Sequence, residues 1–185
     1  MKLNTSQIGG GETRLIFSSP SDSWLNKLLD RFSERGYQVH APLIVNMLLT
    51  KVEPDFFLKG DLTCKVEQEC SRCAEKFDLD IKHRFEIIFS EVNGRKTRQD
   101  RENKLTPSDA QGIREFDINF FEGHEIELSP VIEEQFYLAI PFQSFCRENC
   151  LGICQRCGVN RNVTECGCSV SDRIGPFSVL GGLNV

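Results

Sequence analysis

The sequence predicts an α+β fold, in which a mostly antiparallel sheet or partial barrel carries two helices and a cysteine-rich segment. Three observations support this prediction. Several stretches alternate apolar and polar residues with the period of a β-strand, two others repeat apolar residues at helical spacing, and six of the nine cysteines lie between Cys146 and Cys168. We therefore divide the chain into an α+β body, residues 1–145, and a cysteine-rich segment, residues 146–185, docked on that body.

Length and composition are those of a globular protein with its own hydrophobic core. The chain has 185 residues, of which 39% are hydrophobic and 26% are charged. No stretch approaches the roughly 20 apolar residues that span a bilayer, and no apolar segment follows Lys2, so we expect a cytoplasmic protein without a membrane partner. The net charge of −5 disfavours bulk electrostatic binding of nucleic acid, so any contact with RNA must be local.

The first part of the chain predicts one strand and one helix. Residues 1–11 are polar, end in three glycines and are expected to form a frayed leader. Residues 12–19 alternate as a strand does. A helix is predicted over residues 22–35, capped by Ser21 or Ser23. Its apolar stripe, which we interpret as core, comprises Trp24, Leu25, Leu28, Leu29 and Phe32.

The middle of the chain predicts long antiparallel strands. Residues 41–53 and 56–70 are apolar or alternating, and a Pro-Asp turn signal separates them. Alternation resumes over residues 76–82, and residues 85–92 complete the strand. Cys64 falls on the apolar face of its strand, so we interpret it as a small core residue and leave it out of the metal ligands.

Residues 93–112 lose all periodicity and are predicted to form a long loop. This loop is either a solvated hairpin tip or a flexible arm that contacts phosphates, and both interpretations stay open. Its basic residues are Arg95, Lys96, Arg98, Arg101 and Lys104. A strand over 114–121 and a helix over 130–140, capped by Ser129, are predicted next. The apolar run 177–180 is expected to dock back on the body.

The cysteine spacing predicts metal binding, because paired cysteines in a reducing compartment are more often ligands than disulfides. Alternating strands flank Cys70-Ser71-Arg72-Cys73, which places this pair at a β-hairpin tip, as in the knuckles of zinc ribbons. We assign one four-thiolate zinc site first and a second, which joins the hairpin tip to the C-terminal segment, after it. The first set is Cys154, Cys157, Cys166 and Cys168, and the second is Cys70, Cys73, Cys146 and Cys150.

Other partitions of these thiols stay open. Cys150 can replace Cys166 or Cys168, and a single loaded site with a spare pair is the simpler alternative, so we expect one or two Zn²⁺ ions. The three histidines, His40, His83 and His124, are interpreted as solvated or packed rather than as ligands.

No catalytic signature is found in the sequence. A thioredoxin-type Cys-x2-Cys pair begins a helix, whereas strands flank the pair at Cys70 and Cys73. The chain also lacks a phosphate-binding glycine loop and a Ser-His-Asp order. We therefore expect a protein that is not an enzyme and has no small-molecule substrate.

Four stretches together resemble the YceD-type family, from about Gly60 to Leu180. In chain order they are GDLTCKVEQECSRCAEKF, EIELSPVIEEQFYLAIP, CRENCLGICQRCGVNRNVTECGC and DRIGPFSVL. The chain departs from the family pattern with Leu151 in place of Lys, Gln155 in place of Pro and Arg161 in place of Leu. The resemblance implies a bacterial or plastid protein implicated in the accumulation of large-subunit ribosomal RNA, without an established catalytic activity.

Three functional hypotheses follow from the resemblance and the cysteines. In the first, the protein binds ribosomal RNA or a pre-ribosomal large subunit through Arg72, Arg147, Arg156 and Arg161, since zinc knuckles are common RNA-binding modules. In the second, it is a protein-interaction adaptor whose zinc sites are structural and whose acidic surface contacts ribosomal proteins. In the third, it is a thiol redox sensor.

Overall fold

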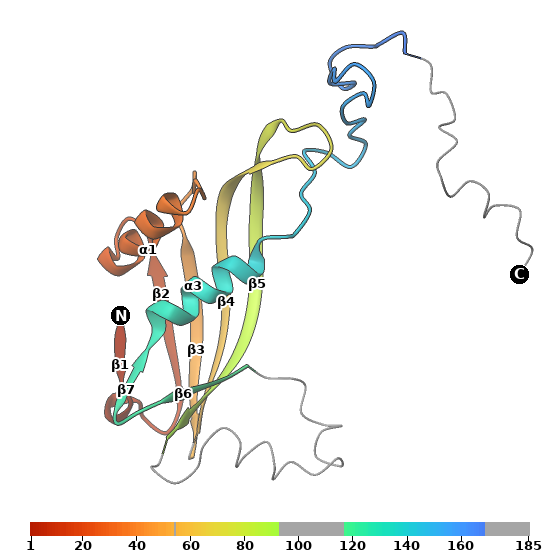
Figure 1. Ribbon diagram of the computed structural model, residues 1–185. Coiled ribbons are helices and arrows are strands. Elements are labelled where there is room, and N and C mark those ends of the chain that lie inside the picture. Colours follow the sequence, from red (N-terminus) through yellow and green to blue (C-terminus); the bar gives the residue numbers. More distant parts are fainter. Residues whose placement is uncertain (54, 93–116, 169–185) are drawn as a thin grey trace, which may run out of the picture.

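The computed structural model describes residues 1–53, 55–92 and 117–168. The predicted loop 93–112 and the apolar run 177–180 lie outside these residues. The described residues form an α+β structure, as predicted, with two sheets, mostly antiparallel, and two long helices (Figure 1).

Five strands form the main sheet, in the order β2-β3-β4-β5-β6. The first four make an antiparallel meander, and β6 pairs parallel to β5. The order is linear, so of the two forms that the sequence allowed, an open sheet and a partial barrel, the described residues form the open sheet. The strands are β2 (Glu12–Ser18), β3 (Ile44–Val52), β4 (Asp55–Glu69), β5 (Lys76–Glu91) and β6 (Asp117–Phe121).

The two helices share one core with the sheet. Helix α1 (Ser23–Glu34) and helix α3 (Leu128–Ala139) meet where the rings of Phe32 and Phe136 stack with centroids 3.8 Å apart. Both rings are fully buried, together with Leu58 and other inward residues of the sheet. No helix in the described part of the chain is long and apolar enough to cross a membrane.

Strand alternation places Cys64 as predicted. Leu62, Cys64 and Val66 point to the buried face of β4, because successive side chains of a strand alternate between its faces. Burial raises the pKa of the Cys64 thiol to about 12, so it stays protonated and behaves as a small apolar residue.

The predicted helix caps are wrong by one or two residues. Asp22, rather than Ser21 or Ser23, precedes α1, and its carboxylate accepts a hydrogen bond from the Ser18 N–H at 2.8 Å. Helix α3 begins at Leu128, so Ser129 lies inside its first turn. The cause is that strand β7 runs directly into α3, which leaves no loop in which Ser129 could act as a cap.

The predicted frayed leader is also wrong. Strand β1 (Lys2–Asn4) pairs antiparallel with β7 (Glu125–Glu127), and the short helix η1 (Thr5–Gln7) follows. The Asn4 side chain accepts a hydrogen bond from the Ser6 N–H at 2.9 Å and so holds the turn between β1 and η1. The partner strand lies far along the chain, so the polar composition of the first residues conceals this pairing.

Strands β4 and β5 form a long hairpin that carries the candidate site at its tip (Figure 1). The two strands pair without interruption from Asp55 opposite Ser90 to Glu69 opposite Lys76. Near the middle, Gly60 lies opposite Phe85, and a Cβ at Gly60 would come within 2.3 Å of the Phe85 ring. The hairpin therefore depends on a glycine at this position to accommodate the aromatic ring.

Candidate metal centres

The hairpin tip forms a tight turn that directs two sulfurs to one side. The Cys70 N–H donates to the Glu75 carbonyl at 2.9 Å, and the Ala74 N–H donates to the Cys70 carbonyl at 2.9 Å. Ala74 has φ +58°, a left-handed conformation that turns the chain sharply after Cys73. The turn thereby brings the two thiols of Cys70-Ser71-Arg72-Cys73 to the same side, as the spacing predicted.

The chain after α3 returns to this tip and binds it through the backbone. The Ser71 N–H donates to the Ser144 carbonyl at 2.8 Å, and the Ser144 N–H donates to Ser71 Oγ at 3.2 Å. Further along, the Ile153 N–H donates to the Arg72 carbonyl at 3.0 Å. These bonds hold both ends of the segment from Ser144 to Ile153 against the hairpin, so its two cysteines face the tip.

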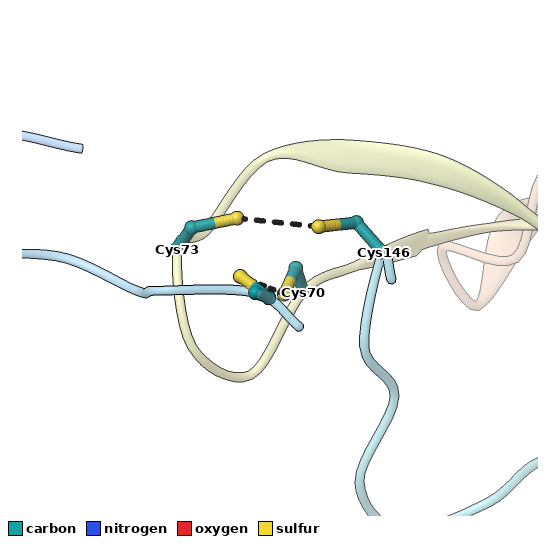
Figure 2. Close-up of side chains that lie close together, drawn as sticks. Cys70, Cys73 and Cys146 are labelled. Carbon is teal, nitrogen blue, oxygen red and sulfur yellow. Dashed lines mark hydrogen bonds between the residues drawn. The ribbon is translucent and has the colours of Figure 1, made fainter. Parts of the chain in front are cut away.

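Four cysteines, here called the hairpin cluster, meet between the tip and this segment. Sγ of Cys70 lies 3.7 Å from Sγ of Cys150. Sγ of Cys73 lies 3.7 Å from Sγ of Cys146, across the tip (Figure 2). All four sulfurs lie within 4.8 Å of one another. A tetrahedral zinc site with Zn–S bonds of about 2.3 Å separates its sulfurs by about 3.8 Å, whereas a disulfide bond is about 2.05 Å long. The hairpin cluster thus has the spacing of a metal site rather than of disulfides.

A second group of four, here called the distal cluster, comprises Cys154, Cys157, Cys166 and Cys168, also within 4.8 Å of one another. Its first pair forms a knuckle, in which the Gly158 N–H donates to the Cys154 carbonyl at 2.8 Å. Gly158 has φ +73°, a conformation that glycine adopts at little cost. The structure therefore separates the eight cysteines into the two sets that the spacing predicted.

The two clusters differ in exposure. In the hairpin cluster Cys70, Cys73 and Cys150 are buried, whereas in the distal cluster Cys157 is exposed. A buried set of thiols exchanges its metal more slowly, since solvent and chelators reach it less easily.

Backbone N–H groups stabilise a thiolate in the hairpin cluster. Burial acts to raise the pKa of Cys70, yet hydrogen bonds from the backbone of Cys146, Arg72 and Cys73 lower it to about 6. Burial and a hydrogen bond with Cys150 raise the pKa of Cys146 to about 12. The pKa values of the four thiols therefore diverge, and a thiolate at one cysteine opposes ionisation of its neighbours. Four negative charges cannot share this volume without a cation.

The distal cluster shows the same division. Hydrogen bonds from the backbone of Cys157 and Arg156 lower the pKa of Cys154 to about 6. A hydrogen bond with Cys157, together with burial, raises the pKa of Cys168 to about 12. A divalent cation would allow all four thiols of each cluster to ionise, and all-sulfur tetrahedral donor sets suit Zn²⁺. The residues present therefore fit the predicted metal.

Two of the three histidines, His40 and His83, have other side-chain partners. The ring of His40 pairs with Asp78 at 2.8 Å, and the ring of His83 pairs with Gln135 at 3.0 Å. Within the described residues, the groups that could hold a metal contain cysteine alone.

Comparison with known proteins identifies the family. A family model described as "Large ribosomal RNA subunit accumulation protein YceD" matches residues 58–184, which is more than half of the chain and includes both clusters. The chain belongs to the YceD family. No solved structure matches it.

Two curated YceD relatives are plant proteins. The chain is 23% identical over 162 residues to the "Large ribosomal RNA subunit accumulation protein YCED homolog 1, chloroplastic" of Arabidopsis thaliana, a match that covers 80% of this chain and 50% of the relative. It is 27% identical over 148 residues to the protein of the same name from Zea mays, covering 72% of this chain and 50% of the relative. The chain therefore spans about half the length of these relatives.

The four arginines that the sequence singled out do not share one environment in this YceD-family chain. The guanidinium of Arg72 donates to the carbonyls of Glu148 and Cys150, both at 3.2 Å, and so lies against the protein. All four arginines are exposed. The other three belong to the segment that carries most of the cluster cysteines: Arg147, Arg156 and Arg161.

Sequence reasoning missed two functional residues, Asn160 and Asn162. The Asn162 side chain donates to Sγ of Cys150 at 3.3 Å, and its Oδ1 accepts the Leu151 N–H at 2.8 Å. The available signal was the Asn-x-Asn sequence at 160–162, shortly after the knuckle at Cys154 and Cys157. Asparagine side chains commonly form hydrogen bonds with nearby backbone groups in turns.

Proposed function

We propose that this YceD-family protein is a non-enzymatic zinc-binding factor that supports large-subunit ribosomal RNA accumulation or ribosome assembly by binding RNA or a pre-ribosomal particle. The observation that carries the proposal is that exposed Arg147, Arg156 and Arg161 all lie on the segment that folds around two four-cysteine clusters. When bound, Zn²⁺ would supply a structural cross-link in each cluster. The names of the family and of the plant relatives support the ribosomal context.

The exposed arginines suit RNA in particular. A guanidinium pairs with phosphate in a bidentate manner and also stacks on bases. Apolar side chains are exposed on the same segment, with Leu151 at 58% and Val163 at 78% exposure, and unstacked bases can pack on such surfaces. This local surface is compatible with a chain whose overall charge is −5.

A second candidate function is the protein-interaction adaptor. Phe142 is 100% exposed, and Leu138 on α3 is 60% exposed, just before the cysteine-rich segment begins. Large exposed apolar residues beside each other in sequence favour a protein partner, and a basic ribosomal protein would complement the acidic chain.

Crosslinking followed by sequencing, in cells that express the tagged full-length protein, tests the first function. We expect ribosomal RNA fragments with the wild type and a loss of at least tenfold with Arg156→Glu combined with Arg161→Glu. The matched control carries the same charge reversal at two exposed residues of the sheet, Arg14→Glu and Arg84→Glu, and it should keep the wild-type yield. Equal yields from all three proteins would contradict RNA binding through Arg156 and Arg161. An absence of ribosomal RNA from the wild type, with protein partners that survive nuclease treatment, would favour the adaptor.

A further inference from the structure

A side chain from the distal cluster's loop reaches a sulfur of the hairpin cluster. Asn162 belongs to the loop between Cys157 and Cys166, and its Nδ2 donates to Sγ of Cys150 at 3.3 Å. Its Oδ1 accepts the Leu151 N–H at 2.8 Å, next to the same cysteine. One amide group therefore contacts both the sulfur and the adjacent backbone of a residue in the other cluster.

Asn160 holds this amide in place. Its Oδ1 accepts from the Asn162 N–H at 2.9 Å and from Asn162 Nδ2 at 2.8 Å. Its own Nδ2 donates to the carboxylate of Glu75 at 3.1 Å. Glu75 is part of the hairpin tip, where its carbonyl accepts the Cys70 N–H. The distal loop therefore contacts Cys150 of the returning segment and Glu75 of the hairpin tip, the two parts between which the hairpin cluster lies.

The backbone supports the same connection. The Arg161 N–H donates to the Gly152 carbonyl at 2.9 Å, and the Ile153 N–H donates to the Arg72 carbonyl at 3.0 Å. A Cβ at Gly152 would lie 2.9 Å from the Arg72 carbonyl oxygen, and Gly152 has φ +69°. A glycine here lets the segment lie directly between the distal loop and the tip.

The loop that carries Asn162 is bounded by Cys157 and Cys166, so a metal in the distal cluster would tie its two ends together. Tying both ends reduces the conformations available to the loop and keeps Asn162 within reach of Cys150. An amide N–H directed at a thiolate orients the ligand and stabilises its charge, and such outer contacts commonly change metal affinity by about 10- to 100-fold.

We propose that metal binding at the two clusters is positively coupled, and that Asn162 is the positioning residue that transmits the coupling. This inference rests on the metal-binding part of the proposed function. Linkage requires reciprocity: a metal in the hairpin cluster strengthens binding in the distal cluster by the same factor.

The test measures the zinc affinity of each cluster separately in the full chain. Reduced, metal-free protein is equilibrated with Zn²⁺ at free concentrations set by chelators, alkylated, and digested for mass spectrometry, so protection of Cys70 and Cys73 reports the hairpin cluster. The proteins are the wild type, Asn162→Ala, Cys157→Ser with Cys166→Ser, and the combination of all three changes. The Val163→Ala variant is the control, because Val163 is an exposed neighbour, and its midpoint should equal that of the wild type.

We expect the free Zn²⁺ needed to protect Cys70 and Cys73 to rise at least tenfold in Asn162→Ala and in the double serine variant. The combined variant should be no weaker than the double serine variant. An unchanged midpoint in the double serine variant would overturn the coupling. An additive further loss on combining Asn162→Ala with it would overturn the role of Asn162 as transmitter.

Asn162→Asp keeps the acceptor for Leu151 and removes the amide donor to Cys150 and to Asn160. It should weaken the hairpin cluster as much as Asn162→Ala does, and a wild-type midpoint would overturn the N–H···S role. If wild-type thiols are never protected at any free Zn²⁺, the metal part of the proposed function fails as well. If both clusters are protected but the midpoint of each does not depend on the other, the coupling is rejected and the metal part of the proposed function stands.

Discussion

The guanidinium of Arg72 lies over the ring of Phe145, 4.3 Å from its centroid. The same group donates to the carbonyls of Glu148 and Cys150. Arg72 is one of the two residues between Cys70 and Cys73, and Phe145 directly precedes Cys146, so this contact joins the hairpin tip to the returning segment beside the hairpin cluster. Arg72 therefore stabilises the closed arrangement of the tip and the returning segment.

Replacing Arg72 by Ala should loosen the hairpin cluster. An exposed cation–π contact and hydrogen bonds to carbonyls together contribute on the order of 1–2 kcal/mol. We therefore expect the variant to lose its zinc to a chelator about tenfold weaker than the one that the wild type requires. Chelator competition monitored by zinc-sensitive dye measures this effect. Arg147→Ala is the control, because Arg147 is exposed on the same segment. Indistinguishable release curves for the two variants would show that Arg72 does not hold the cluster.

Gly60→Ala should destabilise the β4–β5 hairpin. The new Cβ would lie 2.3 Å from the Phe85 ring, and overpacking of this kind costs about 1–3 kcal/mol. Urea unfolding followed by circular dichroism measures the change. Gly10→Ala is the matched control, since no atom lies within 4 Å of its added Cβ. In a Phe85→Leu background the same glycine change should cost less, and an equal cost would refute the clash.

Metal removal should open the contacts between the hairpin tip and the segment from Ser144 to Ile153 and leave the sheet intact. The buried cysteines of the hairpin cluster form a small cluster separate from the main core, which contains the apolar residues of both helices and the sheet. After chelation we expect fast hydrogen exchange at the amides of Ser71 and Ile153 and continued protection at Leu62. Loss of protection at Leu62 on the same timescale would show instead that the metal supports the whole fold.

Acid should act on the metal-free distal cluster through Cys154. Its pKa is lowered from the ordinary thiol range of about 8.5 to about 6, so its thiolate contributes stability above pH 8.5 that is lost as the pH falls through 6. The alkylation rate of Cys154 should therefore rise with a midpoint near pH 6, whereas that of Cys168, whose pKa is raised to about 12, should still be rising at pH 9. Peptide mass spectrometry measures both rates. Coinciding profiles would contradict this division of charge.

Local sequence patterns determined most of the body and the composition of the candidate site. Alternation predicted β4 and β5, because each strand has one buried face, and it placed Cys64 in the core. Helical spacing predicted α1, apart from its cap. The short Cys-x2-Cys spacings predicted that the two thiols of each such pair converge, since a tight turn permits few directions for two sulfurs three positions apart. All of these signals operate within a few residues.

Only the tertiary structure decided how distant segments meet. The pairing of β1 with β7 joins Lys2 to Glu127, and nothing in a short polar stretch indicates a partner so far along the chain. The same holds for Arg72, whose guanidinium lies over the Phe145 ring, and for Asn162, whose amide reaches a sulfur of the other cluster. Periodicity records which face of an element is buried, whereas the choice of partner depends on long-range packing, which leaves no local pattern.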